Sequence, residues 1–383
     1  MKVGLIGPIH PFRSGEAQSN TMLCENLALN HDVVAYSFKM LYPKLLFPGK
    51  SQTYDSQKVL NFERKFILNT MNPINWIISF FKIRSRHLDV VLVTWHAIFL
   101  APILMTLLSL LKIFSKTEIC IFAHNVYPHE DSILNKMIAW PVLALGDYFI
   151  VLSSKTEYDL KQIFPKAKVK ILVETTYDQH FKQNVLPKEV ARQRLNLEKD
   201  KNVVLFFGLV RPYKGVKYLI EAIPEVLKKI EIKFLIVGEF WEDVNGYRQR
   251  IAELQIDRAV DIVDRFVSDE EAIFYFSAAD IFVLPYISAT YSAVIPLAYG
   301  YNKPVIVSDV LGLTDLVDDG RTGYIVPPKD PASLAEKISE FFRLQRQAEF
   351  IQNVKEKKKL FQWSEEKEAL VFHGLANNRR SSA

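Results

Sequence analysis

Residues 203–229 read VVLFFGLVRPYKGVKYLIEAIPEVLKK, and this stretch decides how the chain folds. An uninterrupted apolar run, Val203–Phe207, ends at Gly208, and a short basic loop then leads into a helix-like stretch, Gly215–Lys229. A buried strand, a tight turn and a helix in this order form one βα unit of a parallel sheet.

Strands and helices alternate in the same way along both halves of the chain, so each half consists of several βα units. The predicted strands are Val3–Ile6, Val33–Tyr36, Val90–Thr94, Ile119–Ala123, Tyr148–Leu152 and Val169–Leu172, then Val203–Phe207, Lys233–Val237, Val260–Val263, Ile281–Leu284, Pro304–Val307 and Gly323–Val326. The predicted helices between them include Ala17–Leu29, Ala97–Phe114, Lys155–Ile163, Gly215–Lys229, Tyr247–Leu254, Asp269–Ala279 and Asp330–Arg343. We therefore expect an α/β protein with two Rossmann-like domains, whose parallel sheets face each other across a cleft.

A polar, irregular segment, Glu174–Asp200, separates the two halves. We expect an N-terminal domain over residues 1–175, a linker over 176–200 and a C-terminal domain over 201–360. Residues 361–383 are predicted as a C-terminal helix and a tail. Because ligands of parallel sheets bind outside the carboxyl ends of the strands, the segments that follow strands should carry the chemistry.

Composition narrows the class of protein. The 383 residues carry a net charge of +5 and two cysteines, with no Cys-x-x-Cys pair and no Cys/His cluster, which argues against a structural zinc site or a disulfide framework. The opening residues MKVGLIGPIHP have too short an apolar run for a signal peptide and indicate a first buried strand. We expect a cytoplasmic protein that binds no nucleic acid, since no recognition module accompanies its charge.

Residues 37–87 concentrate basic and aromatic side chains. Nine Lys or Arg stand there against Asp55 and Glu63: Lys39, Lys44, Lys50, Lys58, Arg64, Lys65, Lys82, Arg84 and Arg86. Basic residues interleaved with aromatic ones suit an anionic membrane surface. The alternative is a solvated helix face with aromatic residues packed in the core.

A second apolar segment, AIFLAPILMTLLSLL at Ala97–Leu111, holds fifteen residues without a charge. A membrane-spanning helix needs about 20 apolar residues. We therefore predict a buried or interfacial helix, not a membrane span.

Two segments of the first half carry candidate site residues. The loop Gly7–Ala17 leads from a strand into a helix, where free N–H groups near Gly15 suit a phosphate or sugar hydroxyls, and it lacks the GxGxxG pattern of NAD-binding folds. The run AHNVYPHE at Ala123–Glu130 is denser in polar groups than packing requires. We expect His124 to act in the site, and Asn125, His129 and Glu130 to lie on its acceptor side. No metal is expected there.

Three segments of the second half complete the predicted site. Gly208 ends a strand, and Arg211 and Lys214 follow at the start of a helix, where two cations make a site for an anion such as a diphosphate. Gly also ends the strand before Glu239. The segment Leu284–Val294 brings three hydroxyl side chains to a predicted helix start, more than one N-cap would need. These hydroxyl residues and their neighbours are Ser288, Thr290, Ser292, Ala293 and Val294.

Taken together, these segments resemble the retaining GT-B glycosyltransferases of the glycosyl transferases group 1 family. The resemblance is carried by FGLVRPYKG at residues 207–215, by GRTGYIVPPKDPASLA at 320–335, and by HNVYPHE, which is similar to the HNVxPHE run of one subset of the family. It implies a hexosyltransferase-type, metal-independent enzyme with a nucleoside diphosphate sugar as donor, retention of anomeric configuration and no cofactor. The implied catalytic residues are His124, Arg211 and Lys214. The implied donor-binding residues are Gly15, Gly208, Glu239, Ser288, Thr290, Ser292, Ala293 and Val294.

The chain departs from the family pattern at its second-half site. Family members usually carry two glutamates eight positions apart, and here those positions hold Ala289 and Leu297. The arginine that commonly follows the loop glycine is replaced by Leu209. Because the HNVxPHE subset tends to have a SATxSxV segment there, and residues 288–294 read SATYSAV, we interpret the departure as a subtype.

The leading hypothesis is transfer of a sugar to a membrane-associated lipid-linked glycan or glycolipid in bacterial polysaccharide assembly, with peripheral contact at the inner face of the plasma membrane. A nucleotide-sugar epimerase on the same fold is one alternative, with carboxylates for proton abstraction at Glu130, Glu239 and Asp315. A non-catalytic partner that binds a nucleotide-sugar is the other alternative, and the missing glutamates favour it.

Overall fold

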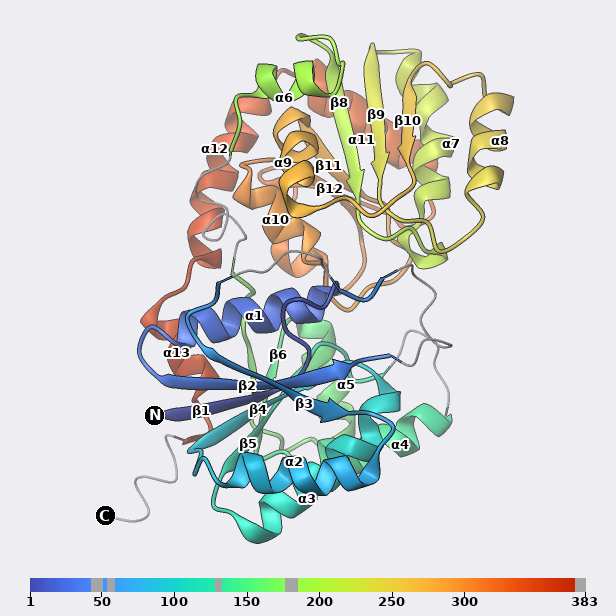
Figure 1. Ribbon diagram of the computed structural model, residues 1–383. Coiled ribbons are helices and arrows are strands. Elements are labelled where there is room, and N and C mark those ends of the chain that lie inside the picture. The colour runs from blue at the N-terminus through green and yellow to red at the C-terminus, as the bar shows by residue number, and fades with distance from the viewer. Residues whose placement is uncertain (43–50, 54–58, 128–132, 176–184, 376–383) are drawn as a thin grey trace. The chain divides into compact units, whose positions relative to one another are not determined.

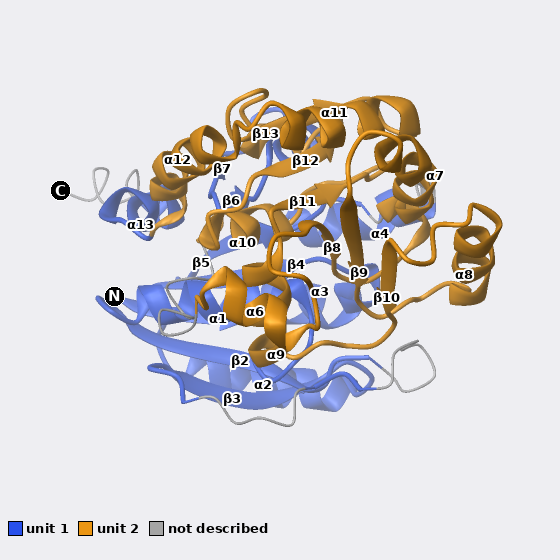
Figure 2. Cartoon of the chain, turned by 90° about the horizontal axis from the view of Figure 1, so that it is seen from above, with its two compact units in different colours: residues 1–173, 363–383 blue, residues 174–362 orange. Residues whose placement is uncertain are grey.

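The computed structural model describes residues 1–42, 51–53, 59–127, 133–175 and 185–375 (Figure 1). The chain divides into two compact units (Figure 2). Unit 1 comprises Met1–Val173 together with Trp363–Ala383, and unit 2 comprises Glu174–Gln362. Each unit is described separately below.

Unit 1 is built on a parallel sheet. Within the described residues it has seven strands in the order β3-β2-β1-β4-β5-β6-β7. They are β1 (Lys2–Ile6), β2 (Asp32–Met40), β3 (Glu63–Asn69), β4 (Val90–Trp95), β5 (Glu118–Ala123), β6 (Tyr148–Val151) and β7 (Val169–Ile171). The helices are α1 (Gly15–Leu27), α2 (Pro73–Arg84), η2 (Ile98–Leu100), α3 (Ala101–Phe114), α4 (Ile133–Leu143), α5 (Ser154–Ile163) and α13 (Glu365–Val371). Helices α2 and α3 cover one face of the sheet and α1 the other (Figure 1).

Unit 2 repeats the plan with a parallel sheet of six strands among its described residues, in the order β10-β9-β8-β11-β12-β13. The strands are β8 (Asn202–Phe207), β9 (Ile232–Val237), β10 (Val260–Val263), β11 (Ile281–Leu284), β12 (Val305–Ser308) and β13 (Gly323–Val326). The helices are α6 (Lys188–Arg194), η4 (Pro212–Lys214), α7 (Val216–Leu227), α8 (Val244–Glu253), α9 (Asp269–Ala278), α10 (Val294–Gly300), η5 (Thr314–Leu316), α11 (Pro331–Arg343), α12 (Gln347–Lys357) and η6 (Lys358–Phe361).

The strand order of each sheet reverses at one point. In unit 1 the chain runs outward from β1 through β2 to β3 and then returns to the other side of β1 with β4. In unit 2 it runs from β8 through β9 to β10 and returns beside β8 with β11. Such a switch point leaves a crevice at the carboxyl ends of the two central strands, and open parallel sheets bind ligands there.

All the predicted strands exist, but the segment between β2 and β4 was predicted incompletely. It holds a strand, β3, and a helix, α2, which the sequence analysis did not expect. β3 is an edge strand with the sequence ERKFILN, and charged residues are common on edges because they discourage pairing with other chains. Phe38 in β2 and Phe80 in α2, two of the aromatic residues of the basic-aromatic stretch 37–87, are buried in the core.

The apolar run Ala97–Leu111 forms the turn η2 and most of α3. One side of α3 packs into the core through Ile103, Leu104, Leu107, Leu108 and Leu111. Within the described part of the chain, no helix has both the length and the hydropathy needed to cross a bilayer.

The C-terminal segment, predicted as a helix and a tail, belongs to unit 1 from Trp363 onward. The carboxylate of Glu368 in α13 accepts a hydrogen bond from Asn30 and lies 2.9 Å from Nε2 of His31. Gly374 lies so close to Tyr148 that an added Cβ would stand 2.1 Å from the tyrosine ring. The segment expected as a linker belongs to unit 2, and its described part contains α6.

A buried ion pair anchors α6 to the amino edge of the unit 2 sheet. Arg192 is 2% exposed, and its Nη2 lies 2.8 Å from Oδ2 of Asp280, just before β11. Its Nε donates to the carbonyl of Ala278. Asp280 also accepts a hydrogen bond from the backbone of Val203 at 2.8 Å and pairs with Lys188. One carboxylate therefore joins α6, β8 and β11.

Replacing Asp280 by Ala should lower the free energy of unfolding of unit 2 by about 3–5 kcal/mol, because the guanidinium of Arg192 would remain buried without a counter-charge. Glu221→Ala is the control, since it removes a partner of Arg250 on the surface and should cost at most about 1 kcal/mol. Urea unfolding followed by circular dichroism measures both. Equal losses in the two variants would contradict the structural role given to Asp280.

Candidate functional site

In unit 1 the loop after β1 is fastened to β4 by close packing. A Cβ added to Gly7 would lie 2.4 Å from Oγ1 of Thr94, so only glycine fits this position. Asn20 donates to the carbonyl of Pro8 at 2.7 Å and accepts from the hydroxyl of Thr94 at 2.9 Å. These contacts fix the start of α1 beside the end of β4, at the switch point.

Helix α1 begins at this crevice. The side chain of Ser14 caps it by accepting from the backbone N–H of Ala17 at 3.1 Å. Gly15 is exposed, and no atom lies within 4 Å of the position where its Cβ would be. Its predicted role in donor binding stays a prediction, but the space in front of it is open.

Three titratable side chains meet at this edge of unit 1: Glu16 in the first turn of α1, His96 directly after β4, and His124 directly after β5. The backbone N–H of His124 donates to the carbonyl of Trp95 at 3.0 Å. The side chain of Asn125 donates to the carbonyl of His96 at 3.3 Å. The ends of β4 and β5 are thus joined, and the two imidazoles belong to one cluster with Glu16.

Burial sets the charge state of this cluster. It lowers the pKa of His124 to about 4 and also lowers the pKa of His96, although the nearby Glu16 carboxylate opposes both shifts. Burial works against the charge of Glu16, but the two imidazoles and hydrogen bonds from its own backbone and Ser14 hold its pKa below the ordinary value. Near neutral pH the cluster therefore consists of one carboxylate and two neutral imidazoles.

The imidazoles retain unused hydrogen-bonding capacity. Among the described residues, neither ring nitrogen of His96 has a hydrogen-bond partner, although the side chain is only 9% exposed. Nε2 of His124 is likewise buried without a partner in the described chain. Buried polar atoms are nearly always bonded to protein, water or ligand. A neutral imidazole offers one donor and one acceptor, which suits a hydroxyl group.

The sequence analysis anticipated only part of this cluster. His124 and Asn125 lie where they were predicted, whereas His129 and Glu130 fall outside the described residues. Glu16 and His96 were not predicted as site residues. His96 follows the predicted strand Val90–Thr94 by two residues, which was a usable signal, whereas Glu16 stands ten residues after the predicted strand Val3–Ile6. A lone Glu and a lone His do not reveal that β1 and β4 are neighbours.

In unit 2 two glycines bring the ends of β8 and β9 into contact. Gly208 and Gly238 have φ angles of 119° and 151°, which side chains rarely adopt. A Cβ on Gly238 would lie 2.0 Å from the carbonyl oxygen of Gly208. The Cβ position of Gly208 itself has no atom within 4 Å. Beyond these glycines, the backbone of Val210 donates to the carbonyl of Glu239 at 3.0 Å.

The loop after β8 is also fastened to the loop after β11, across the switch point. Gly215 has a φ of 67°, and a Cβ there would lie 2.0 Å from the carbonyl oxygen of Pro285. The backbone N–H of Ile287 donates to the carbonyl of Tyr213 at 2.7 Å. The turn η4, which carries Lys214, is therefore held in place from both ends.

Lys214 is held by an aromatic partner. Its Nζ donates to the hydroxyl of Tyr286 at 2.8 Å and lies 4.0 Å from the centre of the tyrosine ring. The Tyr286 hydroxyl is in turn 3.4 Å from Oγ of Ser292. Burial lowers the pKa of Lys214, an effect that Tyr213 opposes and Arg211 reinforces. Sequence analysis did not identify Tyr286, which is fully buried.

Arg211 is exposed at the start of the same turn. Its guanidinium carbon lies 5.5 Å from the ring centres of both Tyr213 and Trp241. Within the described residues neither Arg211 nor Lys214 forms an ion pair with a carboxylate. Two cations held by aromatic rings and not neutralised by acids suit a phosphate-bearing ligand.

The segment Leu284–Val294 does not bring its three hydroxyl side chains to the helix start as predicted. Helix α10 has only seven residues, its N-cap is Ala293, and none of the three predicted hydroxyls caps it. Ser292 is buried and turned to Tyr286, Thr290 is half-buried and Ser288 is exposed. Sequence spacing indicated a helix start but not its length. Ala293 and Val294 are half-buried where α10 begins.

Comparison with known proteins fits this arrangement. Residues 187–358 match the family model described as "Glycosyl transferases group 1". Residues 187–358 are therefore a glycosyl transferases group 1 domain. The two positions where the family usually has glutamates hold a buried Ala289 and a half-buried Leu297, so this group 1 domain has no carboxylate at either.

Curated relatives match over part of their length. An uncharacterized glycosyltransferase of Methanocaldococcus jannaschii is 28% identical over 191 residues, which are 49% of this chain and 48% of the relative. The D-inositol 3-phosphate glycosyltransferase of Streptomyces scabiei is 32% identical over 39% of this chain and 36% of its own length. The chain thus spans about a third to a half of the curated relatives it matches.

Solved structures match over the whole chain. Sucrose-phosphate synthase from Thermosynechococcus elongatus has a TM-score of 0.75 at 19% identity and covers 100% of this chain and 99% of its own. Anabaena HepE in complex with UDP has a TM-score of 0.74 at 16% identity, with full coverage of both chains. At these identities the likeness concerns the fold, which is GT-B, with two Rossmann-like domains.

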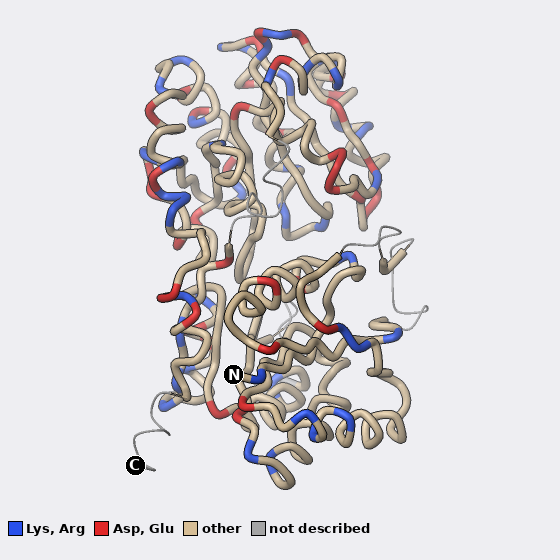
Figure 3. The backbone as a smooth tube through the Cα atoms, turned by 60° about the vertical axis from the view of Figure 1, so that its left-hand side comes forward, with Lys and Arg blue, Asp and Glu red and all other residues tan. Residues whose placement is uncertain are grey.

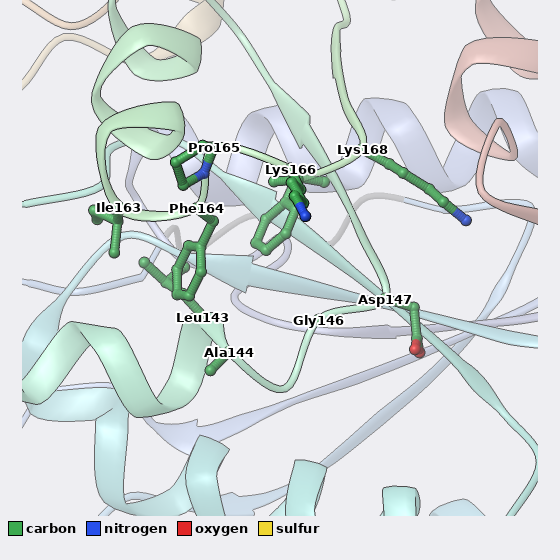
Figure 4. A pocket seen from close by; sticks show the side chains of 11 residues that line it. Leu143, Ala144, Gly146, Asp147, Ile163, Phe164, Pro165, Lys166 and Lys168 are labelled. Carbon is green, nitrogen blue, oxygen red and sulfur yellow. The ribbon is translucent and has the colours of Figure 1, made fainter.

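Unit 1 also has a hollow of about 550 Å³ (Figure 4), and none of its lining residues belongs to the cluster of Glu16, His96 and His124. It is lined by the loops that precede β6 and β7, so it opens at the amino edge of the sheet. Ile163 and Phe164 lie on one side, and Asp147 and Lys168 on the other. Asp147 already pairs with Lys112 and accepts from the backbone of Ile119. The hollow is therefore not part of the candidate site.

Acidification from pH 6.5 to 4.5 should lower the free energy of unfolding of unit 1. In this window an unfolded histidine binds a proton, whereas His124 in the folded chain, with a pKa of about 4, does not. His124→Gln should therefore give a shallower fall than the parent chain. The control is His87→Asn, at an exposed position with a φ of 49° that asparagine tolerates. Urea unfolding at several pH values measures the slopes, and an unchanged slope in His124→Gln would count against a buried neutral His124.

Proposed function

We propose that the chain is a glycosyltransferase that moves a sugar from a nucleoside diphosphate sugar to an acceptor. The observation that carries the proposal is the basic turn at the switch point of the group 1 domain, where Lys214 and Arg211 stand without a carboxylate partner among the described residues. Anabaena HepE, a neighbour in fold, has been solved with UDP and with UDP-glucose, which supports a donor of this chemical class.

The mechanism that we propose relies on electrostatic stabilisation of the leaving group. When the glycosidic bond to the donor breaks, negative charge develops on the diphosphate. A lysine ammonium has three N–H donors, and Lys214 spends one of them on Tyr286. Two remain for phosphate oxygens, and the exposed guanidinium of Arg211 adds a planar pair of donors. These cations supply the charge that a divalent metal supplies in other transferases, so the reaction is proposed to be metal-independent.

We assign the binding of sugar hydroxyls to the Glu16, His96 and His124 cluster of unit 1. Two neutral imidazoles and a carboxylate offer donors and acceptors without the positive charge that a phosphate would require. The buried ring nitrogens of His96 and His124 lack hydrogen-bond partners in the described chain. Ring nitrogens in this state can bond the hydroxyl groups of an uncharged polyol. Retention of anomeric configuration is part of the proposal and comes from the family resemblance.

The proposed acceptor is a lipid-linked glycan or glycolipid of bacterial polysaccharide assembly, met at the inner face of the plasma membrane. A relative that is 26% identical over 46% of this chain is a lipopolysaccharide 1,2-N-acetylglucosaminetransferase of Salmonella typhimurium. The basic and apolar residues between β2 and α3 support a peripheral contact with such a membrane.

A second candidate function is a non-catalytic nucleotide-sugar-binding partner. The observation in its favour is the replacement of the two family glutamates by Ala289 and Leu297, which removes both carboxylates from this part of unit 2.

Hydrolysis of UDP-, GDP- and ADP-sugars separates the two functions. A transferase should slowly release nucleoside diphosphate from at least one donor without added acceptor, and EDTA should leave that rate unchanged. A folded protein that binds the nucleotide but turns over no donor, even with lipid-linked acceptors added, would contradict the transferase proposal.

Lys214→Met should slow turnover of the preferred donor by about 30- to 1000-fold, the equivalent of roughly 2–4 kcal/mol of lost transition-state stabilisation. The control is Lys217→Met, which removes an exposed cation from the first turn of α7, three residues away. Steady-state kinetics on both variants measure the effect. Turnover by Lys214→Met at the parent rate would contradict the proposal that Lys214 stabilises the leaving diphosphate.

A further inference from the structure

The outer side of α2 carries an apolar stripe that no described residue of unit 1 covers. Ile74, Ile77, Ile78 and Phe81 are 73%, 42%, 47% and 58% exposed. Their spacing of i, i+3, i+4 and i+7 places them on one side of the helix. They form a continuous row of apolar side chains along α2.

The opposite side of the same helix packs against the core of unit 1. Phe80 and Ile83 are 3% and 0% exposed and belong to the main apolar cluster of unit 1. A surface helix normally packs one apolar side and exposes a polar one. Because α2 is apolar on both sides, its outer stripe requires an explanation other than packing of the sheet, and exposed apolar patches mark interaction sites.

The neighbouring helix adds exposed apolar side chains at its C-terminal end. Nε of Arg84 donates to the carbonyl of Phe114 at 2.9 Å, and the rings of Phe80 and Phe114 lie 6.1 Å apart, so the C-terminal ends of α2 and α3 adjoin. Ile113 and Phe114 are exposed at that end. Met71, just before α2, is also exposed.

The two helices of this surface carry charge of one sign. Neither α2 nor α3 contains Asp or Glu, whereas Lys82 and Arg84 close α2 and Lys116 follows α3. Lys82 and Lys116 are exposed and have no ion pair within the described residues. In unit 2, by contrast, helices α11 and α12 each carry both acidic and basic residues, and Figure 3 shows the two kinds in red and blue. An apolar stripe rimmed by cations is complementary to a surface that is apolar below and anionic above.

We propose that this docking face, made of Ile74, Ile77, Ile78, Phe81, Ile113 and Phe114 with Lys82 and Lys116, binds an anionic lipid bilayer. Helix α2 lies along the bilayer surface, its stripe enters the acyl boundary, and the lysines meet lipid phosphates. A second copy of the chain fits less well, because two such faces would bring like charges together without a carboxylate on either helix. Binding at this face would bring the chain to a lipid-linked acceptor, and this connection rests on the proposed function.

Co-sedimentation with vesicles tests the docking face. The parent chain should bind vesicles of phosphatidylcholine and phosphatidylglycerol at least ten-fold more tightly than vesicles of phosphatidylcholine alone. The variant Ile74→Ser/Ile78→Ser/Phe81→Ser should lose at least ten-fold of this binding. The matched control is Leu29→Ser/Leu344→Ser/Leu360→Ser, which changes three exposed apolar residues elsewhere and should bind as the parent does. Lys82→Ser/Lys116→Ser should weaken binding most at low salt.

Three results would overturn the proposal: equal sedimentation of the stripe variant and the parent, no binding of the parent to anionic vesicles, or a parent dimer that the stripe variant alone converts to a monomer in light scattering. Donor hydrolysis is measured on the same samples without lipid, and the stripe variant should keep the parent rate. Sedimentation without any donor turnover would leave the docking face in place and contradict the proposed function.

Discussion

The reversal of strand order in each parallel sheet is the constraint on which the rest of the structure depends. Crossovers between parallel strands are right-handed, so strands added to either side of β1 or β8 send their helices to opposite faces of the sheet. The loops that leave the two central strands diverge and leave a crevice between them. Glu16 and His96 lie at the reversal in unit 1, and Lys214 and Tyr286 at the reversal in unit 2.

The two crevices have opposite chemical character. In unit 1 burial keeps two imidazoles neutral beside a carboxylate, which favours uncharged hydroxyl groups. In unit 2 two cations rest on aromatic rings instead of acids, which leaves their charge for an anion. Glycines hold both arrangements, because Gly7 and Gly215 allow contacts that any side chain would block.

Most of the fold could be predicted from the sequence, because buried parallel strands are continuous apolar runs. β3 was not predicted because it is an edge strand that carries charges. α2 was not predicted because it is apolar on two sides, so its apolar residues do not recur with the period of a one-sided helix. Lys214, Arg211 and His124 were identified because cations or polar groups directly follow strands. Glu16, His96 and Tyr286 were not, since their roles follow from strand adjacency and burial, which only the fold supplies. The return of the C-terminal segment to unit 1 depends on contacts such as Glu368 with Asn30, and no local pattern encodes it.

The central claim is that the basic turn of the group 1 domain holds the diphosphate of a nucleotide-sugar. A crystal structure of the chain with UDP bound tests it most directly. The account predicts a diphosphate oxygen within hydrogen-bond distance of Nζ of Lys214, in front of Gly208, with the guanidinium of Arg211 turned toward it. A diphosphate bound elsewhere, with Lys214 still paired only to Tyr286, would contradict the account.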